Sequence, residues 1–98
     1  MKIKVGINGM GRIGRMILRS IFEENKKIEI KHINNRTNSE TCSTLLKYDS
    51  IHGKFKADIN FDEKNLIVNK NKISFGQETN LNKIDWKRYG VDYVFECT

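Results

Sequence analysis

The fold of this chain is decided by one short stretch, IKVGINGMGRIG, which occupies residues 3–14. Its first half is short and rich in β-branched residues, so it predicts a β-strand over residues 3–7. Its second half places glycines in a Gly-x-Gly-x-x-Gly pattern at Gly9, Gly11 and Gly14. Beyond that pattern the apolar residues recur every three or four positions, which predicts an α-helix. The stretch therefore predicts a strand, a glycine-rich turn and a helix in immediate succession.

The three glycines have distinct physical roles when such a turn binds a dinucleotide. Gly9 permits the tight turn, Gly11 lets the backbone approach a pyrophosphate, and Gly14 allows the helix to pack closely on the strand. The amide groups of Arg12 and Ile13 stand at the start of the helix, where the helix dipole favours negative charge. Because the pattern lies between a strand and a helix, it predicts a binding site for NAD or NADP at these five residues.

The next part of the chain repeats the strand–helix order. The first helix should cover residues 12–25, and residues 28–33 alternate apolar and polar residues as a second strand does. Thr37 and Glu40 have the spacing of a capping box, which predicts a second helix over residues 37–48. Strands that alternate with helices form parallel sheets with right-handed crossovers. The apolar face predicted for the first helix consists of Ile13, Met16, Ile17 and Ile21.

The second half of the chain has a different pattern. Alternating residues at 55–61 and two short apolar runs at 66–68 and 73–75, separated by polar turns, predict an antiparallel meander. A short helix or turn is expected over residues 81–89, and residues 91–97 predict a buried parallel strand. The fold class is therefore α/β, a Rossmann-type doubly wound parallel sheet that is incomplete and carries a short antiparallel meander.

The sequence shows no linker, repeat or domain boundary within its 98 residues. Thr98 falls at the carboxyl end of a predicted core strand, which is where open parallel sheets bind their ligands. We therefore expect residues 1–98 to be the N-terminal part of an NAD(P)-binding domain, with the catalytic domain absent from this chain.

The end of the second predicted strand is where dinucleotide-binding folds usually place an acidic residue, about 20 positions after the glycine pattern. This chain has Asn35 followed by Arg36 there instead. The Asn35 amide can still hydrogen-bond a ribose hydroxyl, but it carries no charge. The Arg36 guanidinium either pairs with the 2′-phosphate of NADP, whose oxygens its planar shape fits, or points into solvent. We therefore expect that NADP is accepted, at least alongside NAD.

The reactive side chains of the chain do not form a recognisable catalytic group. A nucleophilic cysteine needs a histidine or a helix start nearby, and a catalytic histidine needs a nucleophile or carboxylate within reach. We therefore interpret Cys42, Cys97, His32 and His52 as structural residues and assign no catalytic residue. The two cysteines also lack the spacing of a disulfide framework or a metal site, so no metal is expected.

Charge and hydropathy narrow the possible partners. The chain has 18 basic and 12 acidic residues, which give a net charge of +6. This charge indicates either a surface that binds anionic partners or only a solvated, lysine-rich surface. The aromatic residues are spaced as core positions, so nucleic acid is not expected as the main partner. No apolar stretch approaches the length of a membrane span and no leader segment is visible, which indicates a cytoplasmic protein. The aromatic residues assigned to the core are Phe22, Tyr48, Phe55, Phe61 and Phe75.

Several segments together resemble glyceraldehyde-3-phosphate dehydrogenase. Residues 6–15 are similar to the opening fingerprint of that family, and residues 46–55 are similar to its second and more specific signature. Trp86, the segment 90–92 and the closing segment 96–98 match later landmarks of the family. The resemblance spans essentially the whole chain.

The resemblance also implies roles for single residues. It implies that the backbones of Arg12 and Ile13 contact the cofactor pyrophosphate, and that Asn35 stands where the family has a ribose-binding aspartate. Thr79 takes the place of an arginine beside the adenine, and Thr98 lies near the path toward the nicotinamide. With the residues predicted above, the candidate cofactor-binding residues are Gly9, Gly11, Arg12, Ile13, Gly14, Asn35, Arg36, Thr79 and Thr98.

The activity that the resemblance implies is that of the phosphorylating enzyme, typically a homotetramer. It oxidises and phosphorylates glyceraldehyde 3-phosphate to 1,3-bisphosphoglycerate in glycolysis and gluconeogenesis. The family's nucleophilic cysteine, histidine base and two phosphate-anion sites are expected beyond Thr98, so this chain alone should be inactive. Two alternatives remain open: erythrose-4-phosphate dehydrogenase has a similar opening region, and a non-catalytic nucleotide-binding regulator would need only the glycine turn.

Overall fold

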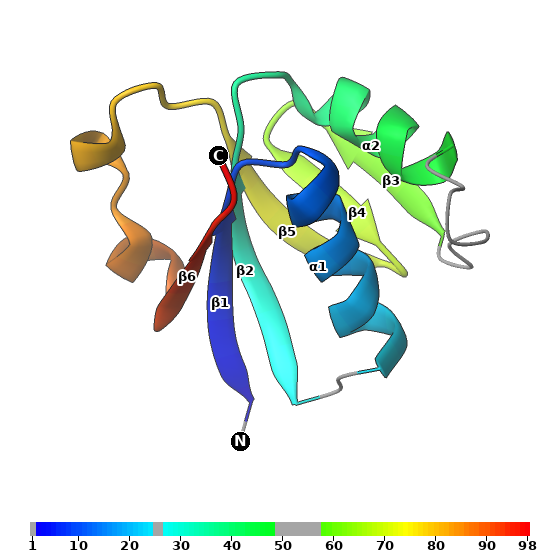
Figure 1. The fold of residues 1–98 in the computed structure, drawn as a ribbon, viewed down its shortest axis with the longest axis horizontal. Coiled ribbons are helices and arrows are strands. Elements are labelled where there is room, and N and C mark those ends of the chain that lie inside the picture. Colours follow the sequence, from blue (N-terminus) through cyan, green and yellow to red (C-terminus); the bar gives the residue numbers. More distant parts are fainter. Residues whose placement is uncertain (1, 25–26, 49–57) are drawn as a thin grey trace.

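The computed structural model describes residues 2–24, 27–48 and 58–98. The six strands of this part of the chain form one sheet, in the order β3-β4-β5-β2-β1-β6. Figure 1 shows α1 in front of the sheet and α2 beside β3 and β4. In chain order the elements are β1 (Ile3–Asn8), α1 (Arg12–Glu24), β2 (Ile28–Asn34), α2 (Ser39–Tyr48), β3 (Ile59–Asp62), β4 (Asn65–Val68), β5 (Asn71–Gly76), the 3-10 helices η1 (Leu81–Lys83) and η2 (Trp86–Tyr89), and β6 (Tyr93–Glu96).

The sheet joins a parallel half to an antiparallel half. β1 pairs in parallel with β2 and with β6, and β2 pairs in parallel with β5. β5 then pairs antiparallel with β4, and β4 pairs antiparallel with β3. The predicted α/β class with a parallel sheet and a meander is therefore confirmed, although the meander continues the parallel sheet edge to edge. Residues 55–57 of the predicted meander lie outside the described residues.

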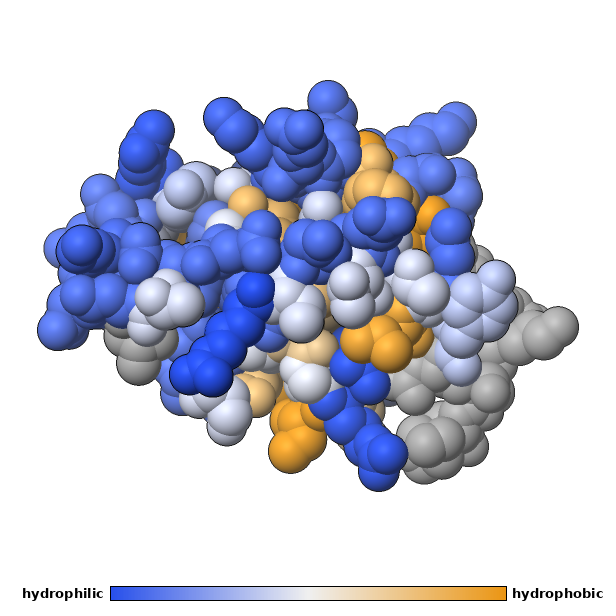
Figure 2. Space-filling model, turned by 90° about the horizontal axis from the view of Figure 1, so that it is seen from above, coloured by the Kyte–Doolittle hydropathy of each residue, from blue (hydrophilic) through white to orange (hydrophobic). Residues whose placement is uncertain are grey.

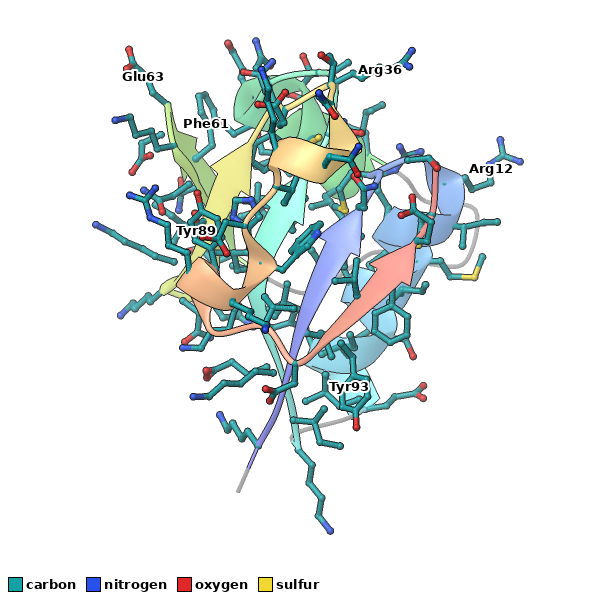
Figure 3. The ribbon with its side chains drawn as sticks, turned by 90° about the vertical axis from the view of Figure 1, so that its left-hand side faces the viewer. Arg12, Arg36, Phe61, Glu63, Tyr89 and Tyr93 are labelled. Carbon is teal, nitrogen blue, oxygen red and sulfur yellow. The ribbon has the colours of Figure 1, made fainter. Side chains whose placement is uncertain are left out.

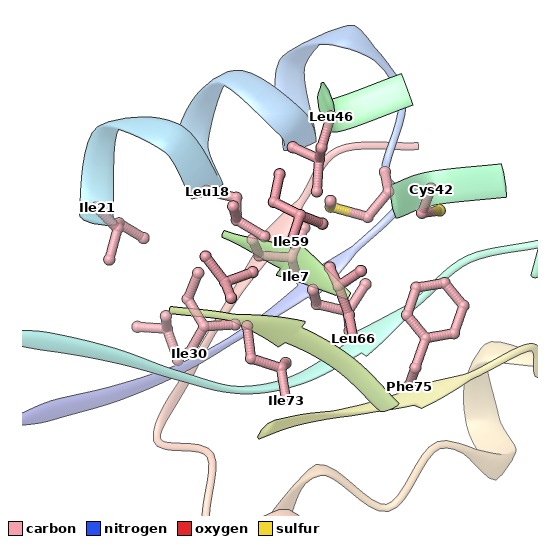
Figure 4. Close-up of a cluster of buried hydrophobic side chains, with 14 residues drawn as sticks. Ile7, Leu18, Ile21, Ile30, Cys42, Leu46, Ile59, Leu66, Ile73 and Phe75 are labelled. Atoms are coloured by element: carbon pink, nitrogen blue, oxygen red, sulfur yellow. The ribbon is translucent and has the colours of Figure 1, made fainter. Parts of the chain in front are cut away.

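The core lies between the two helices and one face of the sheet (Figure 4). Leu18 and Ile21 of α1 and Leu46 of α2 pack there with strand residues such as Ile7 and Ile30, and each of the five is at most 8% exposed. Burying an aliphatic side chain of this size contributes about 1.5–3 kcal/mol. The core thus holds both helices against β1 and β2, whose carboxyl ends carry the candidate site.

The opposite face of β1 and β2 is covered by η2. The register of the two strands shifts between Val5, which lies opposite Ile30, and Gly6, which lies opposite His32. Because side chains alternate across a strand, Gly6 and His32 face away from the helices. Trp86 lies against both: a Cβ on Gly6 would be 2.5 Å from Trp86 Cζ3, and the rings of His32 and Trp86 have centroids 5.4 Å apart. His32 is therefore buried beneath η2.

The buried face of α1 differs from the prediction. Ile13 and Met16, predicted to face the sheet, are 64% and 48% exposed. Gly14 is turned toward the sheet, because a Cβ on it would collide with the Gly9 carbonyl. The position one turn further on, Leu18, is therefore buried instead. The buried residues of α1 are Gly14, Leu18, Arg19 and Ile21.

The start of α2 also differs from the prediction. The helix begins at Ser39, and Asn38 caps it, because Asn38 Oδ1 accepts a hydrogen bond from the Thr41 N–H at 2.8 Å. The Thr37 hydroxyl, predicted to be the cap, instead accepts a hydrogen bond from the Asn35 amide at 2.7 Å. The capping-box prediction was therefore right about the helix and wrong about the capping residue.

Several apolar residues predicted in the core are exposed. Tyr48 and Phe61 are 77% and 42% exposed, whereas Phe75 is buried. Tyr93 and Val94 belong to the strand predicted to be buried, yet they are 67% and 39% exposed. Among the described strands β6 pairs with β1 alone, at one edge of the sheet, so one flank of it remains open. Phe22 packs partly buried against the core, and Phe55 lies outside the described residues.

Candidate cofactor-binding site

The turn between β1 and α1 packs directly on the end of β6. Gly9 has a φ of +97°, in the left-handed region that favours glycine. A Cβ on Gly9 would lie 2.9 Å from the Cys97 carbonyl and from the Thr98 nitrogen, and a Cβ on Gly14 would collide with the Gly9 carbonyl. The fold itself therefore requires the first and third glycines of the pattern.

Gly11 occupies a different environment. It is exposed, and a Cβ built on it would meet no described atom within 4 Å. The Arg15 N–H donates to the Gly11 carbonyl at 3.0 Å, so the amides of Arg12 and Ile13 precede the first helical hydrogen bond. The first turn of α1 contains no acidic residue, so its positive dipole end is not compensated there. Backbone donors and open space thus meet where an anionic group would bind.

The corner after β2 is tied to the glycine turn through Asn35. Its Oδ1 accepts a hydrogen bond from the Met10 N–H at 3.0 Å, while its Nδ2 donates to Thr37 Oγ1 at 2.7 Å and to Cys42 Sγ at 3.3 Å. Because a backbone N–H can only donate, the amide oxygen must be the atom that faces the turn. One lone pair of Oδ1 remains for a ligand hydroxyl.

A chain of side-chain hydrogen bonds crosses the carboxyl ends of three strands. Thr98 Oγ1 donates to Glu96 Oε1 at 2.9 Å, and Asn8 Nδ2 donates to both Glu96 carboxylate oxygens at 2.9 and 3.0 Å. Asn34 Nδ2 donates to Asn8 Oδ1 at 3.1 Å and to the Glu78 carbonyl at 2.9 Å. Asn34 Oδ1 accepts from the Glu78 N–H at 2.8 Å. The network joins β6, β1, β2 and the segment after β5 into one hydrogen-bonded floor.

The turn, the corner and the floor surround a cleft of about 520 Å³. Figure 2 looks onto this end of the molecule, where the surface is mostly hydrophilic and apolar residues form separate patches. Arg12 and Ile13 are exposed at the start of α1, next to Gly11, and Gly14 is buried behind the turn. Arg12 and Arg36 both extend from this end of the sheet (Figure 3). The predicted residues that line the cleft are Gly9, Gly11, Asn35, Arg36, Thr79 and Thr98.

Sequence reasoning missed part of the cleft lining. Asn8 and Asn34 each place a polar residue at the carboxyl end of a strand, where open parallel sheets bind ligands. That signal was present in the sequence and could have identified both. Thr37 was considered only as a helix cap. The missed lining residues are Asn8, Asn34, Thr37, Glu78 and Cys97.

The described cysteines and histidine are buried or half-buried. Cys42 is fully buried, and burial raises the pKa of its thiol. Cys97 is half-buried beside the cleft, and burial together with the neighbouring Glu96 carboxylate raises the pKa of its thiol. Burial lowers the pKa of His32 to about 4, so its ring is neutral near pH 7. His52 lies outside the described residues.

The described part of the chain contains neither a group of side chains suited to a metal ion nor a helix suited to a membrane span. Within residues 2–24, 27–48 and 58–98, no three His, Cys, Asp or Glu side chains are grouped closely enough to hold a metal ion. No helix in these ranges is both long enough and apolar enough to cross a membrane.

Comparison with known proteins places the whole chain in one group. Residues 3–98 match the family described as "Glyceraldehyde 3-phosphate dehydrogenase, NAD binding domain". The glyceraldehyde-3-phosphate dehydrogenases of Chlamydia pneumoniae and Thermotoga maritima are each 45% identical over 96 residues, and glyceraldehyde-3-phosphate dehydrogenase 1 of Bacillus subtilis is 41% identical over 98 residues. These alignments cover 98%, 97% and 100% of this chain. The chain spans 29% of the length of each of these relatives.

Proposed function

This chain belongs to the family of the NAD-binding domain of glyceraldehyde-3-phosphate dehydrogenase, and from that premise we propose that residues 1–98 form the N-terminal part of the NAD(P)-binding domain of a phosphorylating glyceraldehyde-3-phosphate dehydrogenase. The whole enzyme would oxidise and phosphorylate glyceraldehyde 3-phosphate to 1,3-bisphosphoglycerate in glycolysis or gluconeogenesis. The part of this function that belongs to the chain is binding of the dinucleotide.

The observation that carries the proposal is the open space over Gly11. A Cβ there would meet nothing within 4 Å, whereas a Cβ on Gly9 or Gly14 would run into backbone atoms of the turn or of the end of β6. Of the three glycines in the pattern, the one that packing does not require is thus the one whose missing side chain leaves room for a ligand. Because the start of α1 offers free amide donors beside that room, the site fits the pyrophosphate of a dinucleotide.

The residues around the cleft divide among the parts of the dinucleotide. The turn from Gly9 to Gly14 would hold the pyrophosphate through the backbone of Arg12 and Ile13. Asn35 would accept a hydrogen bond from a ribose hydroxyl with its remaining Oδ1 lone pair, and Arg36 stands beside it. In the same arrangement Thr79 would lie beside the adenine and Thr98 toward the nicotinamide.

The chemistry of the reaction would come from the nicotinamide, which accepts a hydride when it is bound. The described thiols do not supply a nucleophile, because burial raises the pKa of both Cys42 and Cys97. No catalytic residue is therefore assigned to this chain. Its own contribution is to fix the dinucleotide against the strand ends through the Asn8–Asn34–Glu96 floor.

The assembly and location of the whole enzyme are part of the same proposal. It would act as a homotetramer in the cytoplasm, with the phosphorylated aldehyde and phosphate as its other partners. Free Cys42 and Cys97 fit a reducing compartment. Exposed apolar side chains on α1 and β6 support contact with further protein surface, and these are Ile13, Met16, Tyr93 and Val94.

The test is to fill the space over Gly11. A Gly11→Val substitution in the intact protein should leave folding unchanged but weaken NADH binding at least about tenfold, a free-energy loss of about 1.4 kcal/mol. Isothermal titration calorimetry measures the affinity, and circular dichroism checks the fold. Ser20→Val, at an exposed position of the same helix, is the matched control and should bind normally. Unchanged affinity in Gly11→Val would refute the proposed site.

A further inference from the structure

We propose that the corner formed by Asn35, Arg36 and Thr37 selects a dinucleotide that carries a 2′-phosphate, and that Arg36 recognises this phosphate. The proposal rests on the proposed function, because it concerns the adenosine ribose of the bound dinucleotide. It assigns NADP, in preference to NAD, as the cofactor class.

The backbone of the corner is held in place by the neighbouring strand. The Asn35 N–H donates to the Gly76 carbonyl at 3.0 Å, and Gln77 Nε2 donates to the Arg36 carbonyl at 3.0 Å. These two hydrogen bonds fix the backbone position of Arg36. Its side chain extends at the carboxyl end of the sheet (Figure 3), and the residue lines the cleft. Arg36 and Asn35 therefore line the same cleft at adjacent positions.

The charges around the cleft leave Arg36 available for an anion. Among the described residues that line the cleft, Arg36 is the one base and Glu78 is the one acid. The Glu78 carboxylate accepts a hydrogen bond from the Asn80 N–H at 3.0 Å, within its own loop. In the described part of the chain no carboxylate lies within ion-pairing distance of the Arg36 guanidinium. A phosphate would therefore gain a charge-assisted, bidentate partner without displacing an existing one.

The neutral amide of Asn35 removes the usual barrier to a 2′-phosphate. A carboxylate at this position would repel the phosphate, whereas Asn35 presents an uncharged Oδ1 that already accepts the Met10 N–H. The Thr37 hydroxyl accepts one Asn35 hydrogen, and when it donates, its acceptor is Cys42 Sγ at 3.7 Å. Sulfur is a weak acceptor, so the Thr37 hydrogen can turn to a phosphate oxygen instead.

The experiment compares the affinities of the intact protein for NADPH and NADH by isothermal titration calorimetry. The wild type should bind NADPH more tightly than NADH, and tighter binding of NADH would overturn the proposal. Arg36→Ala should weaken NADPH binding about 10- to 100-fold, as expected for loss of a charge-assisted hydrogen bond, and leave NADH binding close to the wild type. The NADPH affinity of Arg36→Lys should lie between those of the wild type and Arg36→Ala, because lysine keeps the charge but not the planar guanidinium.

Two further variants separate the local effect from net charge and from folding. Asn35→Asp should weaken NADPH binding and retain NADH binding. It should also fold, because Met10 N–H, the Thr37 hydroxyl and the Cys42 thiol can all donate to the new carboxylate. Arg88→Ala removes an exposed arginine of η2 that does not line the cleft, and it should not change the NADPH to NADH ratio.

The outcomes distinguish the two proposals. If NADH binds but Arg36→Ala changes both affinities equally or neither, the 2′-phosphate proposal is wrong and the proposed function stands. If Arg88→Ala shifts the ratio as much as Arg36→Ala, the effect is one of net charge and the proposal is again wrong. If the wild type binds neither dinucleotide, the proposed function fails, and the selectivity proposal fails with it.

Discussion

Gly11 and Gly14 stand three residues apart in the same turn, but an added methyl group should act differently at each. A Cβ on Gly14 would collide with the Gly9 carbonyl, while a Cβ on Gly11 meets open space. We expect Gly14→Ala to lower the free energy of unfolding by about 1–3 kcal/mol, as overpacking does. Gly11→Ala should change it by less than about 0.5 kcal/mol. Urea unfolding followed by circular dichroism measures both, and equal stabilities would contradict the packing described for Gly14.

His32 should make the stability of the protein depend on pH. Burial lowers its pKa to about 4 from 6.5, so between these values the unfolded chain binds a proton that the folded chain does not. The stabilising effect is complete above pH 6.5 and is lost as the pH falls toward 4. We expect a loss of about 2 kcal/mol in the free energy of unfolding between pH 7 and pH 5.

The matched variant for this prediction is His32→Phe, which keeps an aromatic ring against Tyr89. The His32 and Tyr89 rings are stacked with centroids 3.8 Å apart. Phenylalanine does not titrate, so the difference between the two proteins isolates the His32 contribution from that of other groups. Denaturant unfolding at a series of pH values should give a flatter profile for His32→Phe, and parallel profiles would refute the assignment.

Single residues were predictable from sequence where the requirement was local. The glycine pattern identified the tight turn at Gly9 and the close packing at Gly14, since both concern backbone within a few residues. The sequence could have placed Asn8 and Asn34 at ligand-binding strand ends, but it could not have given their hydrogen-bond partners. Their hydrogen-bond partners stand as far as 88 and 44 positions away, and sheet order alone brings them together.

At the scale of elements, Asn34 connects β2 to the segment that follows β5. Its side chain is 4% exposed and makes hydrogen bonds to Asn8 and to both backbone groups of Glu78. Asn34→Ala would leave buried polar groups without partners, so we expect a loss of about 2–3 kcal/mol in the free energy of unfolding and weaker dinucleotide binding. Thermal or urea unfolding and calorimetric titration measure the two effects.

Asn82→Ala serves as the control for this substitution. Asn82 is an exposed residue of η1, so its truncation should change the stability by less than about 0.5 kcal/mol. If Asn34→Ala were as mild as Asn82→Ala, the hydrogen bonds from the Asn34 side chain to Glu78 would not contribute to stability.

Most elements followed from sequence periodicity, but their orientation did not always follow. The strand, helix, strand, helix order and the two short antiparallel strands were predicted close to their observed bounds. The buried face of α1 differs from the predicted face. Ile13 and Met16 are apolar but exposed, because the contact of Gly14 with the turn determines which face of the helix points to the sheet. That contact depends on how closely helix and strand approach, which hydrophobic periodicity does not report.

At the scale of the whole molecule, the 98-residue chain by itself should be inactive as a dehydrogenase. Neither described thiol is activated, because burial raises the pKa of Cys42 and Cys97. We expect no NAD(P)-dependent oxidation of glyceraldehyde 3-phosphate when cofactor reduction is followed by absorbance. Measurable turnover by the purified chain would show that it contains a nucleophile and a base that the described residues do not reveal.

The same chain should associate with itself through β6. Tyr93 and Val94 are exposed on an edge strand, and such edges pair readily with other strands. Val94→Lys should reduce the association measured by sedimentation velocity, because a charge on an edge strand opposes pairing. Lys72→Glu, on β5 inside the sheet, should have little effect, and an equal effect of both would argue against β6 as the contact.

The overall class and the end of the sheet that carries the cleft were predictable, because parallel strands after a glycine turn dictate both. The edge position of β6 was not. Residues 91–97 read as a buried strand, and only the strand order shows that β6 has β1 on one side and no described strand on the other.

The packing of Trp86 makes the protein its own optical probe. It is the only tryptophan in the sequence, so all indole emission comes from this one ring. The ring lies against the backbone of Gly6, two residues before the end of β1, and edge-on to the His32 imidazole. A protonated imidazole quenches indole emission, whereas a neutral one does so far less. Acid titration should therefore lower the Trp86 fluorescence intensity near pH 4, as His32 is protonated. The wavelength of the emission maximum would show whether η2 has already separated from the sheet.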